Sequence, residues 1–273
     1  SLKVFHPETV ALLHDAGLRN CSYIYRPYID HQEPYLERAG IGAAAALDAA
    51  ADYCRRWIDG LERWIPLGVE FLIESVNETM PTGNLETQRR AVAFDRAFIA
   101  VLPRFAPFAR PIVYTAPSGN IHPDEFGILV DLARECAAAG GAFGPHGYWS
   151  VVDKVSYLVP PPGKHHDRDY QLRFDVLDRY LYERGVRNLR IFIGETGAIG
   201  AHGTGDQVGY WQNPDDGWKH RHVFNGDLDA YADDWLVFDS QLAATLAGRQ
   251  NRIIGAAVFT SGFGSWDLFQ IRD

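Results

Sequence analysis

Residues 189–195 read Leu-Arg-Ile-Phe-Ile-Gly-Glu (LRIFIGE), a nearly continuous apolar run that ends in an acid. A strand that is covered by helices on both faces has this composition, because neither face meets solvent. The run therefore predicts a central strand of an α/β protein, with Glu195 at its carboxyl end. A charged side chain in that place is unusual, since most acids lie on solvated helix faces.

Six further segments have strand character, and helical segments separate them. Each strand candidate is short, apolar or aromatic, and bounded by turn residues. Helical spacing of apolar residues, and Gly or Pro at the ends, mark the helices between them. The predicted strands are 2–5, 21–28, 69–78, 112–116, 143–149 and 253–259, and the predicted helices are 8–17, 43–65, 86–102, 123–139, 170–184 and 229–247.

Seven strands that alternate with helices predict a parallel sheet with crossover helices. The length of 273 residues suits one (β/α)8 TIM barrel over residues 1–273, treated as a single domain. An eighth strand is needed to close it, so we expect the first strand either to precede Ser1 or to lie unrecognised in the chain. An open doubly wound sheet is the alternative, but no GxGxxG follows the first strand to support a dinucleotide site.

Composition excludes several classes of function. The formal net charge of -9 argues against a nucleic-acid or anionic-membrane surface, because phosphates attract basic patches. No apolar run approaches the roughly 20 residues of a membrane helix. The three cysteines, Cys21, Cys54 and Cys136, form no CxxC pair, so we expect buried thiols rather than a disulfide framework or a zinc site.

A second acid ends a second strand. Glu78 closes the stretch VEFLIESVNE (69–78), and it precedes Glu195 by 117 residues. That interval holds three strand–helix units, so the two acids belong to strands on opposite sides of a barrel mouth. Retaining glycosidases place two carboxyl groups about 5–5.5 Å apart across a sugar, one as nucleophile and one as acid/base. Opposed strands with inward side chains can supply that spacing, so the pair is a candidate for this chemistry.

Arg26 and Glu74 form a second predicted pair inside the barrel. Glu74 has the strand parity of Glu78, so both side chains are expected on one face. An unpaired Glu74 in a barrel interior is costly. We therefore expect a contact between Arg26 and Glu74 within about 6 Å.

Two long loops follow strands, at 151–169 and 198–226. Loops of this length in a compact domain are usually functional or mobile. The second holds Tyr210, Trp211 and Trp218, whose flat rings suit the apolar face of a sugar, or simply pack the loop. Four loop histidines could suggest a metal, but they have no companion cluster on a strand and we expect them to be solvent-exposed: His165, His166, His220 and His222.

The ordered motifs YRPYI (25–29), VEFLIESVNE (69–78), GPHGYW (144–149), FIGETG (192–197) and VFTSGFGSWDLF (258–269) resemble clan A glycoside hydrolases, in particular a bacterial and phage-associated group. The resemblance covers about residues 2–271. In that clan an Asn-Glu pair ends the fourth strand and the nucleophile ends the seventh. Asn77–Glu78 and Glu195 fit these places when the strands found here are numbered two to eight.

The resemblance implies roles for further residues. Glu195 is expected to attack the anomeric carbon, and Glu78 to protonate the leaving oxygen and later deprotonate water. Asn77 is expected to bind the 2-hydroxyl group of the sugar. The remaining implied sugar-site residues are His146, Tyr148, Arg26 and Trp266, of which Tyr148 and Arg26 are expected to support Glu195. No cofactor is expected, and the expected partner is a carbohydrate substrate.

Two other functions fit parts of the sequence. A glycan-binding or structural barrel module would keep the fold without turnover, although it has no need of Asn77, Glu78, Tyr148 and Glu195 together. A metal-dependent barrel hydrolase is a further option, which sensitivity to a chelator would favour.

Overall fold

The structure is a computed structural model, and it describes residues 2–4, 14–17, 22–27, 29–59, 61, 70–117, 119–150, 173–199, 229, 233, 236 and 252–258. Its centre is a parallel sheet. The strands are β1 (Leu2–Val4), β2 (Tyr23–Tyr25), β3 (Phe71–Glu74), β4 (Ala109–Val113), β5 (Ala142–Phe143), β6 (Gly147–Ser150), β7 (Arg190–Ile199) and β8 (Ile253–Val258). Every pairing between them is parallel. The α/β class predicted from the sequence is confirmed.

β5 and β6 are two pieces of one predicted strand, 143–149. Both pair with β7, β5 at Arg190 and Ile191 and β6 from Thr196 onward, on the side opposite β8. The segment between them, which includes Pro145 and His146, interrupts the regular pairing. The described strands therefore occupy seven positions in the order β1, β2, β3, β4, β5/β6, β7 and β8, as the sequence predicted.

Side chains alternate between two apolar cores, because successive residues of a strand point to opposite faces. One face meets the helices through residues such as Tyr23, Phe71 and Val113. The other face encloses a small cluster made only of strand residues: Ile24, Leu72, Ile112, Ala142 and Phe192, with Ile254 and Ala257 packed against it. A sheet whose inner face packs against itself is curled.

The curled sheet is not shown to be a closed eight-stranded barrel. Among the described strands, β1 and β8 each pair on one side only. Side chains nevertheless bridge the interior. Lys3 of β1 donates a hydrogen bond from Nζ to the carbonyl oxygen of Gly194 in β7, at 2.6 Å, although the two strands are not neighbours in the sheet.

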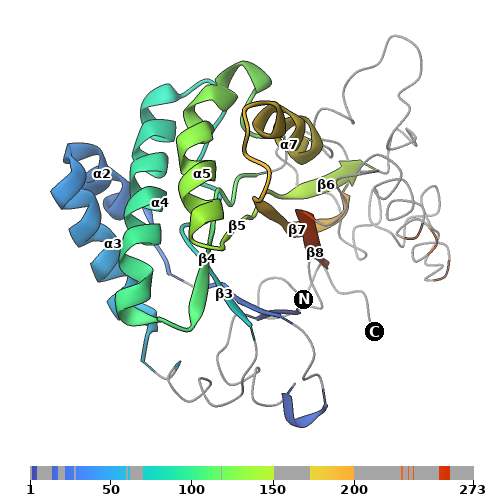
Figure 1. The fold of residues 1–273 in the computed structure, drawn as a ribbon, viewed down its shortest axis with the longest axis horizontal. Coiled ribbons are helices and arrows are strands. Elements are labelled where there is room, and N and C mark those ends of the chain that lie inside the picture. The colour runs from blue at the N-terminus through green and yellow to red at the C-terminus, as the bar shows by residue number, and fades with distance from the viewer. Residues whose placement is uncertain are drawn as a thin grey trace.

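Helices cover the outer face of the sheet (Figure 1). They are α2 (Glu33–Ile41), α3 (Ala43–Trp57), α4 (Leu85–Phe105), the 3-10 helix η2 (Pro123–Leu129) with α5 (Val130–Ala138), and α7 (Arg173–Glu183). Figure 1 shows α2, α3, α4 and α5 side by side on this face. Residues 229, 233 and 236 are helical, as predicted for 229–247, whose other residues lie outside the described part.

Three helix predictions need correction. α2 was not among the predicted helices; Gly40 near its end faces the side chain of Arg90 on α4, and a Cβ there would lie 2.8 Å from Cγ of Arg90. α4 continues past Pro103, and the N–H of Ala106 donates to the carbonyl of Leu102 at 2.8 Å. The predicted helix 43–65 ends earlier, at Trp57.

The described part also settles two smaller expectations. Cys54 and Cys136 are buried and form no disulfide, as expected, whereas Cys21 lies outside the described residues. No helix among the described residues is long and apolar enough to cross a membrane.

Asp95 of α4 ties the helix layer to the sheet. Its Oδ1 accepts a hydrogen bond from Oγ of Ser75 at 2.6 Å, and its Oδ2 accepts one from the N–H of Tyr114 at 2.9 Å. Both donors lie at the carboxyl ends of strands β3 and β4. Burial raises the pKa of Asp95 to about 7, although both hydrogen bonds oppose the rise.

Because the folded protein holds the proton of Asp95 to a higher pH than the unfolded chain does, the free energy of unfolding should fall as the pH rises through 7. The Asp95→Asn variant lacks this titration. Between pH 5 and pH 8 we expect the wild type to lose about 2–3 kcal/mol of stability relative to the variant. Urea unfolding at the two pH values measures this difference, and parallel pH curves for the two proteins would contradict the assignment.

Candidate active site

Glu78 stands at the rim of the sheet, four residues after β3 ends. Its N–H donates to the carbonyl of Thr115 at 2.7 Å, and Asn77 forms an isolated parallel bridge with the same residue. The backbone of Glu78 has a φ of 54°, a region that side-chain-bearing residues adopt only when the surroundings hold them there. Its side chain is 45% exposed, so the carboxyl group is accessible to solvent.

Glu195 reaches the same place through an irregularity in β7. Ile193 and Thr196 are three residues apart, whereas their partners in β8, Ala256 and Val258, are two apart. The extra residue reverses the alternation of side chains, as a β-bulge does. Phe192 points into the sheet interior, and without the bulge Glu195 would point outward to the helices. With it, the Glu195 side chain lies in the interior and is 8% exposed.

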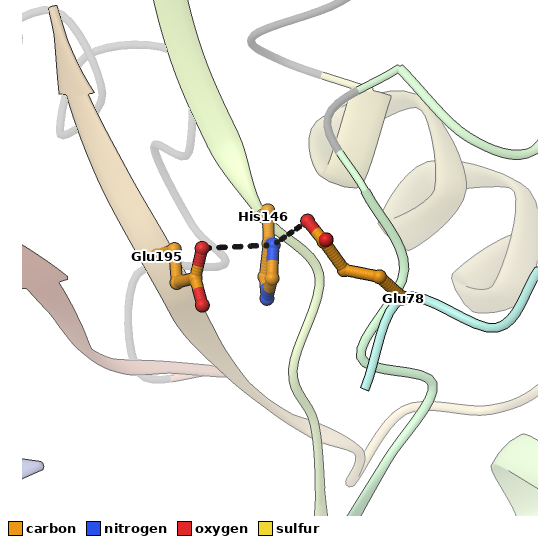
Figure 2. A group of neighbouring side chains, drawn as sticks. All are labelled: Glu78, His146 and Glu195. Carbon is orange, nitrogen blue, oxygen red and sulfur yellow. Dashed lines mark hydrogen bonds and ion pairs between the residues drawn. The ribbon is translucent and has the colours of Figure 1, made fainter. Parts of the chain in front are cut away.

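The two carboxyl groups meet at His146, as Figure 2 shows. One oxygen of Glu78, one of Glu195 and a ring nitrogen of His146 all lie within 4.8 Å of one another. Nδ1 of His146 is 2.9 Å from Oε1 of Glu78 and 3.4 Å from Oε2 of Glu195. Segments after β3, before β6 and within β7 supply the three side chains, so the cluster exists only in the folded sheet.

Arg26 is buried directly after β2 and forms ion pairs with two acids. Its Nε donates to Oε2 of Glu74 and its Nη1 donates to Oε1 of Glu195. The predicted contact between Arg26 and Glu74 is confirmed. Although burial opposes the charge, Glu74 and Glu195 raise the pKa of Arg26 above its ordinary value. Because the guanidinium is planar and its Nε is bound to Glu74, its Nη1 holds the Glu195 carboxylate in one orientation.

The third contact of Arg26 determines the tautomer of His146. Nη2 of Arg26 lies 3.1 Å from Nε2 of His146, and a guanidinium can only donate hydrogen bonds. Nε2 must therefore accept, which leaves the proton of a neutral imidazole on Nδ1. That N–H then donates to Oε1 of Glu78, the nearer of the two carboxyl groups. His146 thus links the acid at the rim to the buried cation.

Glu74 completes the charge balance beneath the site. Its Oε1 pairs with Nζ of Lys3 at 3.0 Å, and its side chain is fully buried. Burial alone raises the pKa of Glu74, but Arg26 and Lys3 outweigh it and hold the pKa below its ordinary value. Two cations, Lys3 and Arg26, therefore balance two buried carboxylates, Glu74 and Glu195, while Glu78 stands above them at the opening.

The sequence-predicted site residues are therefore only partly placed. Glu78, Glu195, His146 and Arg26 are brought together, and Asn77 lies beside Glu78. Oδ1 of Asn77 is buried without a hydrogen-bond partner among the described residues. β6 carries the backbone of Tyr148, but its side chain lies outside the described part, as do Trp211 and Trp266.

Sequence reasoning missed two residues that shape the site. Lys3 is the single charged residue in the run LKVF, and a charge within an apolar strand could have indicated an interior partner. Gly194 was taken only as part of the apolar run. A Cβ at this position would lie 2.8 Å from the carbonyl oxygen of Gly144 and 3.2 Å from the His146 ring, so glycine permits the bulge.

Glu78, His146 and Glu195 offer the atoms that a divalent cation binds. Two features oppose a cation at this point. The nitrogen that faces both carboxyl groups carries the imidazole proton, and the guanidinium of Arg26 already binds Glu195. A metal would therefore require His146 to change tautomer and Glu195 to share its charge with two cations.

Comparisons with known proteins identify no family. No protein-family model and no curated protein matches the chain. Among solved structures it is similar to the GH6 enzyme of Orpinomyces sp. Y102, at 14% identity and a TM-score of 0.41, covering 72% of this chain and 59% of that one. It is also similar to L-ribulose 3-epimerase, at 12% identity and 0.39, covering 93% of this chain and 75% of that one.

A third similar structure is a mutant of a hyperthermophilic beta-glucosidase, at 12% identity and a TM-score of 0.42, covering 97% of this chain and 67% of that one. The chain thus spans 59% of the length of the GH6 enzyme. Likeness at this level carries no information about activity, so the function is inferred from the geometry of the site.

Removing the buried cation should destabilise the fold strongly. In Arg26→Met, Glu74 and Glu195 lose their shared donor, and we expect the free energy of unfolding to fall by about 3–5 kcal/mol. The control is Arg96→Met, which breaks the exposed pair between Arg96 of α4 and Glu135 of α5 and should cost less than about 1 kcal/mol. Chemical denaturation measures both changes, and equal losses would refute a central role for Arg26.

Proposed function

We propose that the protein is a retaining β-glycoside hydrolase that acts on an oligo- or polysaccharide by double displacement, on a single (β/α)8-type domain. One observation supports this most directly. One oxygen of Glu78, four residues past β3, and one of Glu195, within β7, lie within 4.8 Å of each other, and the surroundings of the two groups differ. Glu195 is buried and bound by Arg26, whereas Glu78 is half-exposed and free of any cation in the described part.

The difference assigns the roles. Glu195, kept as a carboxylate by Arg26, attacks the anomeric carbon and forms a glycosyl ester as the bond to the leaving oxygen breaks. Glu78 gives its proton to that oxygen. In the second step Glu78 takes a proton from water, the water oxygen attacks the anomeric carbon, and Glu195 leaves as the carboxylate. The sugar keeps its configuration because it is inverted twice.

His146 and Asn77 support these steps. The N–H at Nδ1 of His146 donates to one oxygen of Glu78, which leaves the other oxygen to carry the proton that is transferred. Oδ1 of Asn77 is buried without a partner in the described residues, and a sugar hydroxyl group would satisfy it. The contact gains strength as charge develops at the anomeric centre. In this proposal Tyr148, Trp211 and Trp266 complete the sugar site.

Variants of the two acids should give products of opposite configuration with azide. Glu195→Ala should lower turnover of aryl β-glycosides by on the order of 10⁴-fold or more, and azide should restore it as the α-glycosyl azide. Glu78→Ala should be slowed about 10²–10⁴-fold on substrates with poor leaving groups and yield the β-glycosyl azide. Proton NMR of the products identifies the anomer.

Glu70→Gln is the matched control. Glu70 lies just before β3, at the end of that strand opposite Glu78, and it is bound to Arg190. Its turnover should stay within about twofold of the wild type. Full activity of Glu195→Ala on every hydrolysed glycoside would end the proposal. Affinity for glycans without any product would instead indicate a glycan-binding module.

A metal-dependent hydrolase is the second candidate, and the cluster of Glu78, His146 and Glu195 favours it. The proton on Nδ1 of His146 and the position of Arg26 favour the metal-free mechanism. We therefore expect dialysis against EDTA to leave glycosidase activity unchanged, and added Mn²⁺ or Zn²⁺ not to increase it. Activity that is lost on chelation and restored by one of these ions would support the metal-dependent reading.

A further inference from the structure

Lys3 bridges the interior of the sheet from its first strand to the strand that carries Glu195. Its side chain is 6% exposed. Nζ donates to the carbonyl oxygen of Gly194 at 2.6 Å and pairs with Oε1 of Glu74 at 3.0 Å. The register pairs Lys3 with Ile24, an inward residue, so the strand itself directs the lysine inward.

Both contacts lead to Glu195. Gly194 is the residue before it, inside the bulge that turns its side chain inward. Gly194 also packs closely against Gly144 and the His146 ring, so this packing and the hydrogen bond from Lys3 both constrain the segment. Glu74, the second partner, uses its other oxygen to accept from Arg26, and Arg26 donates to Glu195.

Resting on the proposed function, we propose that Lys3 is a positioning residue for the nucleophile Glu195. Through Gly194 it fixes the backbone of the bulge, and through Glu74 it fixes the guanidinium that orients the carboxylate. Lys3 does not reach the sugar or the reacting atoms. Misplacement of an attacking group by about 1 Å can cost on the order of 10²-fold in rate, so loss of this support should be visible in catalysis.

The charge of Lys3 makes the support sensitive to pH. Among the described residues, the charged groups that act on it are Arg26, Glu74 and Glu195. Burial and the charge of Arg26 lower the pKa of Lys3 to about 8, although Glu74 and Glu195 raise it. As the pH rises past 8 the amine loses its charge, and Glu74 then keeps Arg26 as its cation among the described residues.

The kinetic test compares the wild type, Lys3→Met and Arg190→Met on 2,4-dinitrophenyl β-glycosides, whose leaving group needs no proton. Arg190 is the matched control: it bridges the opposite end of β7 to Glu70 and to the carbonyl of Gly140. We expect kcat/KM of the wild type to fall above about pH 8. Lys3→Met should be about 10- to 100-fold slower below pH 8 and lack this fall.

Arg190→Met should keep the rate and the pH profile of the wild type even where it lowers thermal stability. A Lys3→Met profile with the wild-type shape, or an equal loss of rate in Arg190→Met, would show that Lys3 serves stability alone. If Lys3→Met does not fold, the same rates and pH profiles are measured for Lys3→Gln. This variant keeps a hydrogen-bond donor but has no charge.

Amide hydrogen exchange tests the proposal without any turnover. In Lys3→Met, exchange should accelerate in peptides that cover residues 194–199, whereas Arg190→Met should affect the start of β7. Unchanged exchange at 194–199 would overturn the positioning role. A wild-type protein that hydrolyses no glycoside would contradict the proposed function, and the exchange result would still decide whether Lys3 holds the bulge.

Discussion

The buried guanidinium of Arg26 is the interaction on which the site depends. It lies between two carboxylates from strands that are not neighbours, Glu74 of β3 and Glu195 of β7. Burying these acids without a counter-charge would be prohibitive, and a cation between them both allows burial and fixes their geometry. Lys3 supplies the second positive charge. Because these four charged groups come from four strands or their ends, they meet only in the curled sheet.

Unequal surroundings distinguish two similar acids, and the proposed function rests on that difference. Glu78 stands at the opening in a backbone conformation that the bridge to Thr115 supports. Glu195 is turned inward by the bulge and held from below by Arg26. Chemistry that needs one acid and one base requires surroundings that differ in this way.

His146 connects the two halves of this arrangement. Its Nε2 accepts a hydrogen bond from Arg26, and its Nδ1 donates one to Glu78. The contact with the buried cation therefore determines which ring nitrogen carries the proton. The same geometry bears on the metal question. Three potential metal ligands converge, but Nδ1 of His146, which faces both carboxyl groups, carries the imidazole proton. The guanidinium of Arg26 already supplies a positive charge beside Glu195.

Much of this protein follows from its sequence alone. The apolar runs at 69–78 and 189–195, each ending in a glutamate, predicted parallel strands, since strand composition reports burial directly. Their predicted ends need correction, because β3 ends at Glu74 and β7 continues past Glu195 to Ile199. Strand parity also predicted the contact between Arg26 and Glu74, because a period of two fixes the face of each side chain. Gly185, just past α7, marked a helix end in the same local way.

Only the tertiary structure decided the rest. The bulge at Gly194 depends on how β7 pairs with β8 and on the space beside Gly144, and neither is encoded within one strand. The roles of Lys3 and of the His146 tautomer depend on partners more than 100 residues away along the chain. Local patterns determine which residues form strands and which face they occupy. Long-range pairing determines which charges meet, because electrostatic contacts depend on distance in space and not on separation in sequence.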